Sequence, residues 1–341
     1  MKHILILLMS ILAFTTTSHG ADPHAAGMRA ISVKDPNGQR NLDGFLWHPT
    51  AFDQPSELDF ESKVWVGTPV IKDAGIATGK YPLIVLSHGM FGNAYNQAWL
   101  ASALAQKGYI VAAINHPGTS TWLRDEDQRR ELWKRQQDIS RLIDYLTSTI
   151  EYSVHINPSK IYMAGHSLGG FTAALLAGAR YDALKFDAFC AEIPDELVCG
   201  VLKGWDVAKT AEDRKQMQAD LSDNRIKAFA LFDLGGTQSF STQSLSQINR
   251  PMLIFGAPVM NSGLTLDIES RSLVKALPKQ NVTYIEHATM SHFDFFGLCK
   301  SGGYELLKNE EPGDEIICQG GGDQRAQKHK MIIENVLKTF Q

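Results

Sequence analysis

Residues 160–180 read KIYMAGHSLGGFTAALLAGAR, an apolar run that leads through a Gly-x-Ser-x-Gly motif into an alanine-rich segment. The apolar residues 161–164 are typical of the end of a buried strand, and the alanine-rich residues are typical of a helix. A strand that turns at once into a helix leaves little room for side chains at the corner. Gly165 and Gly169 lack the Cβ atoms that would collide there, so the strained turn presents the hydroxyl of Ser167. The motif predicts a nucleophilic serine, which also needs a base, an acid and oxyanion donors.

The first twenty residues have the organisation of a secretory signal peptide. Lys2 supplies a basic start, and residues 4–14 are apolar. Small residues up to Gly20 suit cleavage before Ala21. The apolar stretch is much shorter than the ~20 residues that a membrane-spanning helix needs. We therefore expect residues 1–20 to be removed, and the mature protein to be periplasmic or secreted with no integral membrane segment.

Composition limits the cofactors and partners that the chain can have. Its 341 residues carry a formal net charge of −4 and show no basic patch, so nucleic acid is not expected as a partner. The chain has neither a His-Glu-x-x-His nor a Cys-x-x-Cys motif, so no metal is expected. No bound cofactor is expected either, because a serine nucleophile needs none. The length suits a single domain, residues 21–341.

The four cysteines form two couples that are close in sequence. In an oxidising compartment an even number of cysteines indicates disulfide bonds, and four cysteines can pair in three ways. We expect the nearest-neighbour pairs Cys190–Cys199 and Cys299–Cys318. Buried free thiols are the alternative.

Apolar runs alternate with amphipathic segments along most of the chain. A hairpin is expected at the start, where residues 28–33 and 42–47 flank the turn sequence DPNGQR. Residues 49–80 are expected to be irregular. Buried strands are then expected, with helices between them, at residues 83–87, 109–114, 161–164, 226–232, 252–255 and 282–285. This alternation predicts an α/β fold, a mostly parallel sheet with helices on both faces.

Residues 181–223 break the alternation of strands and helices. They have mixed helical polarity and contain one cysteine couple. We expect a helical insertion, or lid, over the carboxyl edge of the sheet, where ligands bind in open α/β sheets.

The oxyanion donors are expected after the strand at residues 83–87, where the sequence continues with HGMFGN. In hydrolases of this architecture the loop after that strand supplies one backbone N–H. Met90 is placed to donate it, and Leu168 beside the serine supplies the second. The alternative is that His88 and Gly89 only end the strand in a turn. We expect His88 itself to be a structural residue.

The base is expected late in the chain, in the order serine, acid, histidine. The stretch EHATMSHFDF offers His287 at a strand end and His292 in the following loop. We favour His292, because the apolar FDFF after it can anchor the loop. His287 is then expected to form a hydrogen bond within the loop.

The acid has two candidates. Many hydrolases of this fold carry it just beyond the strand that we place at residues 252–255, but the loop there has no acid until Asp267. One strand earlier, Asp233 follows directly on the strand at residues 226–232. We favour Asp233 as the acid. Its alternative role is a carboxylate that caps a turn.

The segments LSHGMFGN, GHSLGGFTAALLAGA, LFDLGG and SHFDF, in this order, resemble the platelet-activating-factor acetylhydrolase and dienelactone-hydrolase-like branch of the α/β hydrolases. The resemblance covers most of residues 28–340 and implies the α/β-hydrolase fold. The site residues that it implies are Ser167 as nucleophile, Asp233 as acid, His292 as base, and Met90 and Leu168 as oxyanion donors. It also implies a carboxylic ester substrate with a modest acyl chain. Dienelactone hydrolases carry a cysteine at the elbow, so their lactone chemistry is not expected here.

These roles predict an exported serine esterase that works through an acyl-enzyme intermediate on a small-molecule or lipid-like ester. The same site could serve a thioesterase, a lipase or a peptidase. A catalytically silent binding module on a hydrolase scaffold is the remaining alternative. Such modules usually lack part of the triad, whereas this sequence has every part.

Overall fold

The computed structural model describes residues 24–51 and 53–341, so the predicted signal peptide lies outside the described residues. The strands are β1 (Ala25–Val33), β2 (Leu42–Thr50), β3 (Glu57–Asp59), β4 (Thr68–Lys72), β5 (Tyr81–Ser87), β6 (Ile110–Ile114), β7 (Ile156–His166), β8 (Ile226–Phe232), β9 (Met252–Gly256) and β10 (Val282–Glu286). They form a sheet in the order β10-β9-β8-β7-β5-β6-β2-β1-β4-β3. The run from β10 to β6 is parallel throughout, and β2 joins β6 antiparallel.

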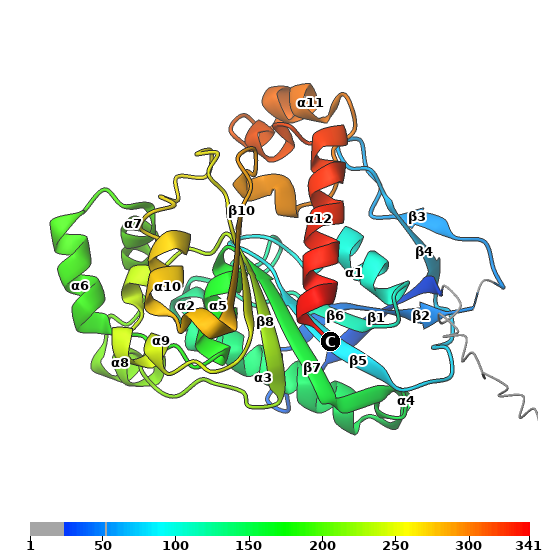
Figure 1. Ribbon diagram of the computed structural model, residues 1–341, viewed down its shortest axis with the longest axis horizontal. Coiled ribbons are helices and arrows are strands. Elements are labelled where there is room, and N and C mark those ends of the chain that lie inside the picture. The colour runs from blue at the N-terminus through cyan, green and yellow to red at the C-terminus, as the bar shows by residue number, and fades with distance from the viewer. Residues whose placement is uncertain (1–23, 52) are drawn as a thin grey trace, which may run out of the picture.

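Helices cover this sheet and connect its strands (Figure 1). They are α1 (Ala98–Ala105), α2 (Glu126–Arg130), α3 (Trp133–Ser148), α4 (Ile150–Ser153), α5 (Leu168–Leu176), α6 (Ala183–Glu192), α7 (Leu197–Gly204), α8 (Ala211–Met217), α9 (Thr242–Ser246), α10 (Ser270–Ala276), α11 (Gly303–Glu310) and α12 (Asp323–Thr339). Among the residues described, none of the helices has both the length and the apolar character needed to cross a membrane. The mostly parallel α/β architecture predicted from the alternation is confirmed.

Alternate residues of β5 show why its sequence is apolar throughout. Leu83 and Val85 pack in the core that α3 and α5 share, whereas Ile84 and Leu86 pack in the core of α1 and α12. Successive side chains of a strand point to opposite faces, so a strand that is covered on both faces needs apolar residues at every position.

Residues 49–80, expected to be irregular, contain the two short strands β3 and β4 at one edge of the sheet. β4 pairs with β1 at only two positions, Ile71 with Gly27 and Lys72 with Met28. Edge strands this short carry too few buried residues to produce an alternating pattern in the sequence. This explains why the pattern was not visible there.

Residues 181–223 contain α6, α7 and α8, which follow α5 at one end of the molecule (Figure 1). The Cys190–Cys199 disulfide joins α6 to α7. A Cβ atom built on Gly235, just after β8, would lie 3.2 Å from Cγ2 of Val198 in α7. Helix α7 therefore packs against the carboxyl end of the sheet. The second disulfide, Cys299–Cys318, lies between His292 and α12 in the chain.

Candidate active site

Ser167 occupies the corner between β7 and α5. Its backbone has φ 53° and ψ −118°, a conformation that non-glycine residues rarely adopt. A Cβ on Gly165 would lie 2.1 Å from the carbonyl oxygen of Gly169, and a Cβ on Gly169 would lie 1.9 Å from the carbonyl oxygen of Ser87. The helix thus approaches its own strand and β5 too closely for any side chain at these two positions. Both glycines of the motif are required by the packing of the turn.

Asp233 and His292 meet near this corner. Asp233 follows β8 directly, and His292 begins a short 3₁₀ helix (His292–Phe295). Nδ1 of His292 lies 2.7 Å from Oδ2 of Asp233, while the other carboxylate oxygen accepts a hydrogen bond from the Ala257 N–H at 3.0 Å. Both side chains are buried. The Nδ1–H of His292 donates to the Asp233 carboxylate. Nε2 therefore carries the lone pair of the neutral ring and can accept a proton.

His166, the residue directly before Ser167, holds the loop that carries His292. Its Nε2 donates to the backbone carbonyl of His292 at 2.9 Å, and the two rings lie 4.4 Å apart between centroids. Burial, with a contribution from the nearby His292, lowers the pKa of His166 well below its ordinary value of 6.5. The ring is therefore neutral at pH 7, and its one proton lies on Nε2. The role of His166 was not predicted from the sequence, although its position inside the Gly-x-Ser-x-Gly motif marks it.

The two alternative residues lie in other surroundings. His287 is exposed, and its Nδ1 lies 3.2 Å from the hydroxyl of Thr289. Asp267 is also exposed and pairs with Arg271 at 3.0 Å. Of the two candidate bases and the two candidate acids, His292 and Asp233 are therefore the pair that the structure brings together.

The loop after β5 passes beside Ser167. A Cβ on Gly89 would lie 3.2 Å from Cβ of Ser167, which leaves little space between the two backbones. Met90 follows in this loop and shares a cavity wall with Ser167 and Leu168. Leu168 is the first residue of α5, and the first N–H groups of a helix have no partner within the helix. Both proposed oxyanion donors therefore flank the serine.

A small apolar cavity of about 60 Å³ adjoins Ser167. Helix α7 and the residue after it form much of its wall. The lining residues are Met90, Ser167, Leu168, Phe171, Leu197, Val198, Val201, Leu202, Trp205, Gly235, Gly236 and Leu264. We call this cavity the α7 pocket.

The loop beside Ser167 is anchored by a buried arginine. Arg135 of α3 is only 1% exposed. Its Nη2 donates to the His88 carbonyl at 2.6 Å and to Oγ of Ser87 at 3.0 Å. Its Nη1 donates to the Thr119 hydroxyl at 2.6 Å, and its Nε donates to the Thr172 hydroxyl of α5 at 3.0 Å. Burial lowers the pKa of Arg135 to about 9, so the guanidinium is still charged at neutral pH.

Beneath the loop lies a second serine–histidine–aspartate set, all of it buried. The Ser87 hydroxyl is 3.0 Å from Nε2 of His116, whose Nδ1 is 2.9 Å from Asp138. Arg40 clamps Asp138 with two hydrogen bonds of 2.7 Å. Burial lowers the pKa of His116 to about 3, which keeps the ring neutral. Because these side chains are 0% exposed apart from Arg40, Ser87 is a structural residue that a substrate does not reach.

His88 belongs to the same buried network. Its Nε2 accepts a hydrogen bond from the His116 backbone N–H at 3.0 Å, and its Nδ1 donates to the Gly89 carbonyl at 2.7 Å. Both ring nitrogens are engaged with backbone groups. This is the structural role expected for His88.

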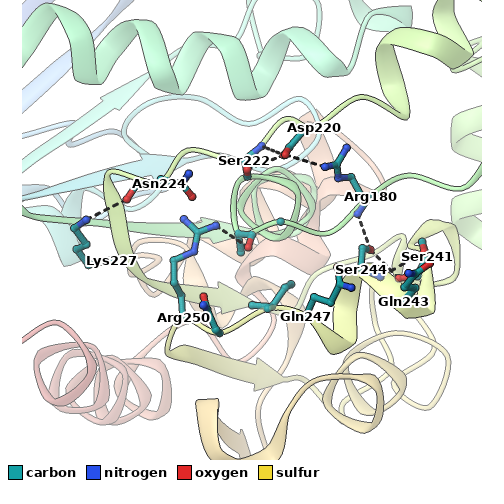
Figure 2. Close-up of a pocket in the computed structure, with 14 residues that line it drawn as sticks. Arg180, Asp220, Ser222, Asn224, Lys227, Ser241, Gln243, Ser244, Gln247 and Arg250 are labelled. Atoms are coloured by element: carbon teal, nitrogen blue, oxygen red, sulfur yellow. Dashed lines mark hydrogen bonds and ion pairs between the residues drawn. The ribbon is translucent and has the colours of Figure 1, made fainter.

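A polar cavity of about 640 Å³ lies at the other end of β8, where the strand begins (Figure 2). Its cationic side chains already have partners. Arg250 donates to four backbone carbonyls, two of them at the end of α5, and Arg180 pairs with Asp220 at 2.8 Å. Lys227 donates to the Asn224 carbonyl. These groups brace the lower end of the sheet, and we do not regard the cavity as a reaction site.

Comparisons with known proteins agree on the type of fold. The profile of the chlorophyllase family matches residues 54–205, a range that includes the Ser167 turn. Cutinase est1 of Thermobifida alba is 32% identical over 30% of this chain and 32% of the cutinase. A platelet-activating factor acetylhydrolase of Cavia porcellus is 27% identical over 49% of this chain and 53% of that protein. The chain thus spans about a third of the cutinase and about half of the acetylhydrolase.

A solved structure extends the likeness to nearly the whole chain. The ferulic acid esterase of Streptomyces cinnamoneus superposes with a TM-score of 0.60 over 94% of this chain and 90% of the esterase. At 19% identity, this similarity shows only that the two proteins share a fold. Together with the elbow geometry, the chlorophyllase-family match and the likeness to the acetylhydrolase and the cutinase support membership of the α/β-hydrolase superfamily, in its platelet-activating-factor-acetylhydrolase-like branch.

Proposed function

We propose that the protein is an exported serine esterase that cleaves carboxylic esters through an acyl-enzyme intermediate. The observation that carries the proposal is the 2.7 Å pair of His292 and Asp233, which His166 holds beside the strained turn of Ser167. The similar proteins include a platelet-activating factor acetylhydrolase and a ferulic acid esterase, and these names are consistent with an ester substrate. The two disulfides fit an oxidising compartment, as expected after removal of residues 1–20.

In this mechanism Ser167 attacks the ester carbonyl while Nε2 of His292 takes the hydroxyl proton. Asp233 keeps the imidazole in the right tautomer and stabilises its positive form. The backbone N–H groups of Met90 and Leu168 stabilise the negative oxygen of the tetrahedral intermediate. His292 then gives its proton to the departing alcohol. Water releases the acyl group by the same sequence of roles.

The α7 pocket supports an acyl group of modest length. It is small and lined almost entirely by apolar side chains, with Ser167 in its wall. A short acyl chain that fills it buries apolar surface, whereas a long chain has to displace α7 or extend into water. We include residues 181–223 in this proposal as a lid on a single domain of residues 21–341.

A panel of p-nitrophenyl esters, from acetate to dodecanoate, tests the function. We expect kcat/KM to be highest for the shorter chains and to fall for the longer ones. Ser167→Ala and His292→Ala should each lower kcat by several orders of magnitude, as in other triads, whereas the exposed His287→Ala should stay close to wild type.

Two outcomes would count against the assignment. Loss of activity in His287→Ala with normal activity in His292→Ala would show that the assignment of His292 as the base is wrong. Equal turnover of the matched thioesters, or faster cleavage of peptide substrates, would show that carboxylic esters are not the preferred substrate class. Each variant is first compared with wild type by thermal melting, so that a loss of activity reports on chemistry.

A further inference from the structure

A second cavity, of about 350 Å³, opens beside the residues that follow the oxyanion loop and His292. Six aromatic residues line it, together with polar and small residues: Phe60, Trp65, Tyr95, Trp99, Trp122 and Phe296. We call it the aromatic groove. The proposed ester cleavage at Ser167 does not use this groove. No local sequence pattern marks it, because its walls come from four separate stretches of the chain.

One end of the groove is linked to His292 through the ring of His166, by one edge-on and one tilted ring contact. Phe296 follows the 3₁₀ helix of His292, and its ring lies 5.2 Å from that of His166 between centroids. The His166 ring in turn lies 4.4 Å from the His292 ring. The groove therefore begins where the base is held.

The floor of the groove continues the oxyanion loop. The Thr121 hydroxyl donates to the Phe91 carbonyl at 2.8 Å, and the Asn93 side chain donates to the Thr121 hydroxyl at 3.2 Å. Thr121 and Asn93 both line the groove. The segment that carries Trp122 is thus tied to the loop that carries Met90.

The chemistry of the proposed reaction determines which half of the ester this side receives. In the acylation step the alcohol oxygen has to take its proton from His292, so the alcohol portion leaves beside that ring. The acyl carbon bonds to Ser167, whose side chain lines the α7 pocket. The acyl chain and the alcohol therefore extend toward different cavities, and the groove beside His292 lies on the alcohol side.

The ring geometry favours a flat aromatic group. Tyr95 already stacks on Phe60 at 4.2 Å, whereas Trp122 is tilted against Tyr95 at 5.6 Å and is 58% exposed. The Trp122 indole therefore has surface that no neighbour covers. Aromatic pairs with centroids 4.5–7 Å apart gain free energy beyond the burial of their area. A ligand ring that packs against Trp122 would gain in this way.

The part of the wall that Trp65 and Val66 form is held by contacts with the segment around Cys299. Trp65 pairs with Cys299 in an isolated antiparallel bridge, and the Val66 N–H donates to the Leu298 carbonyl at 2.8 Å. The Cys299–Cys318 disulfide fixes the same segment. Because this wall is already ordered by these bonds, binding costs little conformational entropy of the protein there.

We propose, resting on the esterase function proposed above, that the aromatic groove binds the alcohol portion of the substrate and selects esters whose alcohol carries an aromatic ring. Trp122 and Trp65 are then residues that determine specificity. Their action is on the binding of the alcohol and not on the chemistry at Ser167.

Two butyrate esters that differ only in the alcohol ring test the proposal on the full mature protein. Benzyl butyrate and cyclohexylmethyl butyrate have rings of the same size, but one is aromatic and the other is not. We expect kcat/KM to favour the benzyl ester by about threefold to tenfold, which corresponds to one aromatic pair. Trp122→Leu should reduce this ratio to near one, and Trp122→Phe should restore part of it. The matched control is Tyr304→Leu, which replaces an exposed aromatic residue outside the groove and should leave the ratio unchanged.

Ethyl butyrate, whose alcohol is too short for the groove, separates this inference from the esterase function. If wild type cleaves ethyl butyrate and the benzyl ratio is near one, or if Trp122→Leu keeps the wild-type ratio, the groove assignment is wrong and the esterase function stands. If none of the esters is cleaved, the esterase function itself fails. A Trp122-dependent preference for methyl phenylacetate over methyl cyclohexylacetate would place the acyl half in the groove and overturn the assignment. A Trp122-dependent preference for 6-O-butyrylglucose over benzyl butyrate would overturn the aromatic specificity.

Discussion

Nε2 of His166 donates a hydrogen bond to the backbone carbonyl of His292 at 2.9 Å, and so joins the end of β7 to the loop that carries the proposed base. Ser167 is the next residue after His166, so one buried ring positions the nucleophile relative to the histidine that activates it. His166 is a positioning residue in this account. Its bond constrains the backbone of His292, while Asp233 constrains the ring.

His166→Leu should lower kcat by roughly ten- to a hundredfold, since displacement of a reacting group by about 1 Å can cost 10²-fold. KM should change little, because substrate binding does not involve this bond. His166→Gln, whose amide can still donate to the His292 carbonyl, should recover part of the loss. The measurement is the separate determination of kcat and KM on p-nitrophenyl butyrate. A variant that raises KM alone would contradict the positioning role.

Asp233→Asn should lower kcat by about 10⁴, because the amide lets His292 settle in the wrong tautomer, as in a well-studied serine protease. Asp267→Asn should cost less than about tenfold, since Asp267 is exposed and its ion pair with Arg271 contributes little to stability. Steady-state kinetics on both purified variants make the comparison. A crippled Asp267→Asn beside a near-normal Asp233→Asn would move the acid to the loop after β9.

Arg135→Lys should reduce both stability and turnover. A lysine keeps the charge but cannot serve the four acceptors that the guanidinium fork reaches. Because hydrogen bonds to charged groups are worth about 1.5–3 kcal/mol each, we expect the free energy of unfolding to fall by about 2–4 kcal/mol in urea titrations. Activity should fall as well, because the oxyanion loop loses its anchor. The exposed Arg271→Lys is the control, and equal stability of the two variants would contradict the anchoring role.

Glu269 should make the protein less stable as the pH rises. It is 2% exposed, accepts a hydrogen bond from the Thr237 N–H, and burial raises its pKa to about 7 from an ordinary 4.5. Between pH 4.5 and 7 the folded state therefore binds more protons than the unfolded state, and the free energy of unfolding falls by up to about 1.4 kcal/mol per pH unit from this group.

Glu269→Gln removes this titration, so its stability should fall less than that of wild type over the same pH interval. The difference between the two stability curves should grow by about 3 kcal/mol from pH 4.5 to pH 7. Urea unfolding at several pH values measures it, with Glu212→Gln on the exposed surface of α8 as the control. Parallel curves for wild type and Glu269→Gln would refute the expected shift.

Local patterns were enough for the elbow and for most of the sheet. Gly165 is needed because of a contact with Gly169, four residues away. The strand predicted at residues 226–232 coincides with β8, and the one predicted at 83–87 lies within β5, because both are apolar at nearly every position. The buried hydrogen-bond partners of the loop after β5 could not be predicted from local patterns. Arg135 has the same appearance in the sequence as a solvated arginine of an amphipathic helix, and only the packing of α3 beneath β5 shows that it is enclosed.

The remaining contacts depend on which distant segments meet. Ser87, His116 and Asp138 are separated by 29 and 22 residues, and nothing in their local sequence marks them as a buried set. The bond from His166 to His292 spans 126 residues. The aromatic groove likewise needs Trp65 and Phe296 to lie together, which follows from the pairing of Trp65 with Cys299.

Covalent labelling with a fluorophosphonate tests most directly whether Ser167 is the activated nucleophile. The mature protein is treated with a small excess of the reagent, and the adduct is located by intact-mass analysis and peptide mapping. We predict one adduct per chain, on the peptide that contains Ser167, and none on Ser167→Ala. His292→Ala should label far more slowly than wild type, because the base that activates the hydroxyl is missing. An unlabelled wild-type protein, or an adduct that persists in Ser167→Ala, would contradict the account.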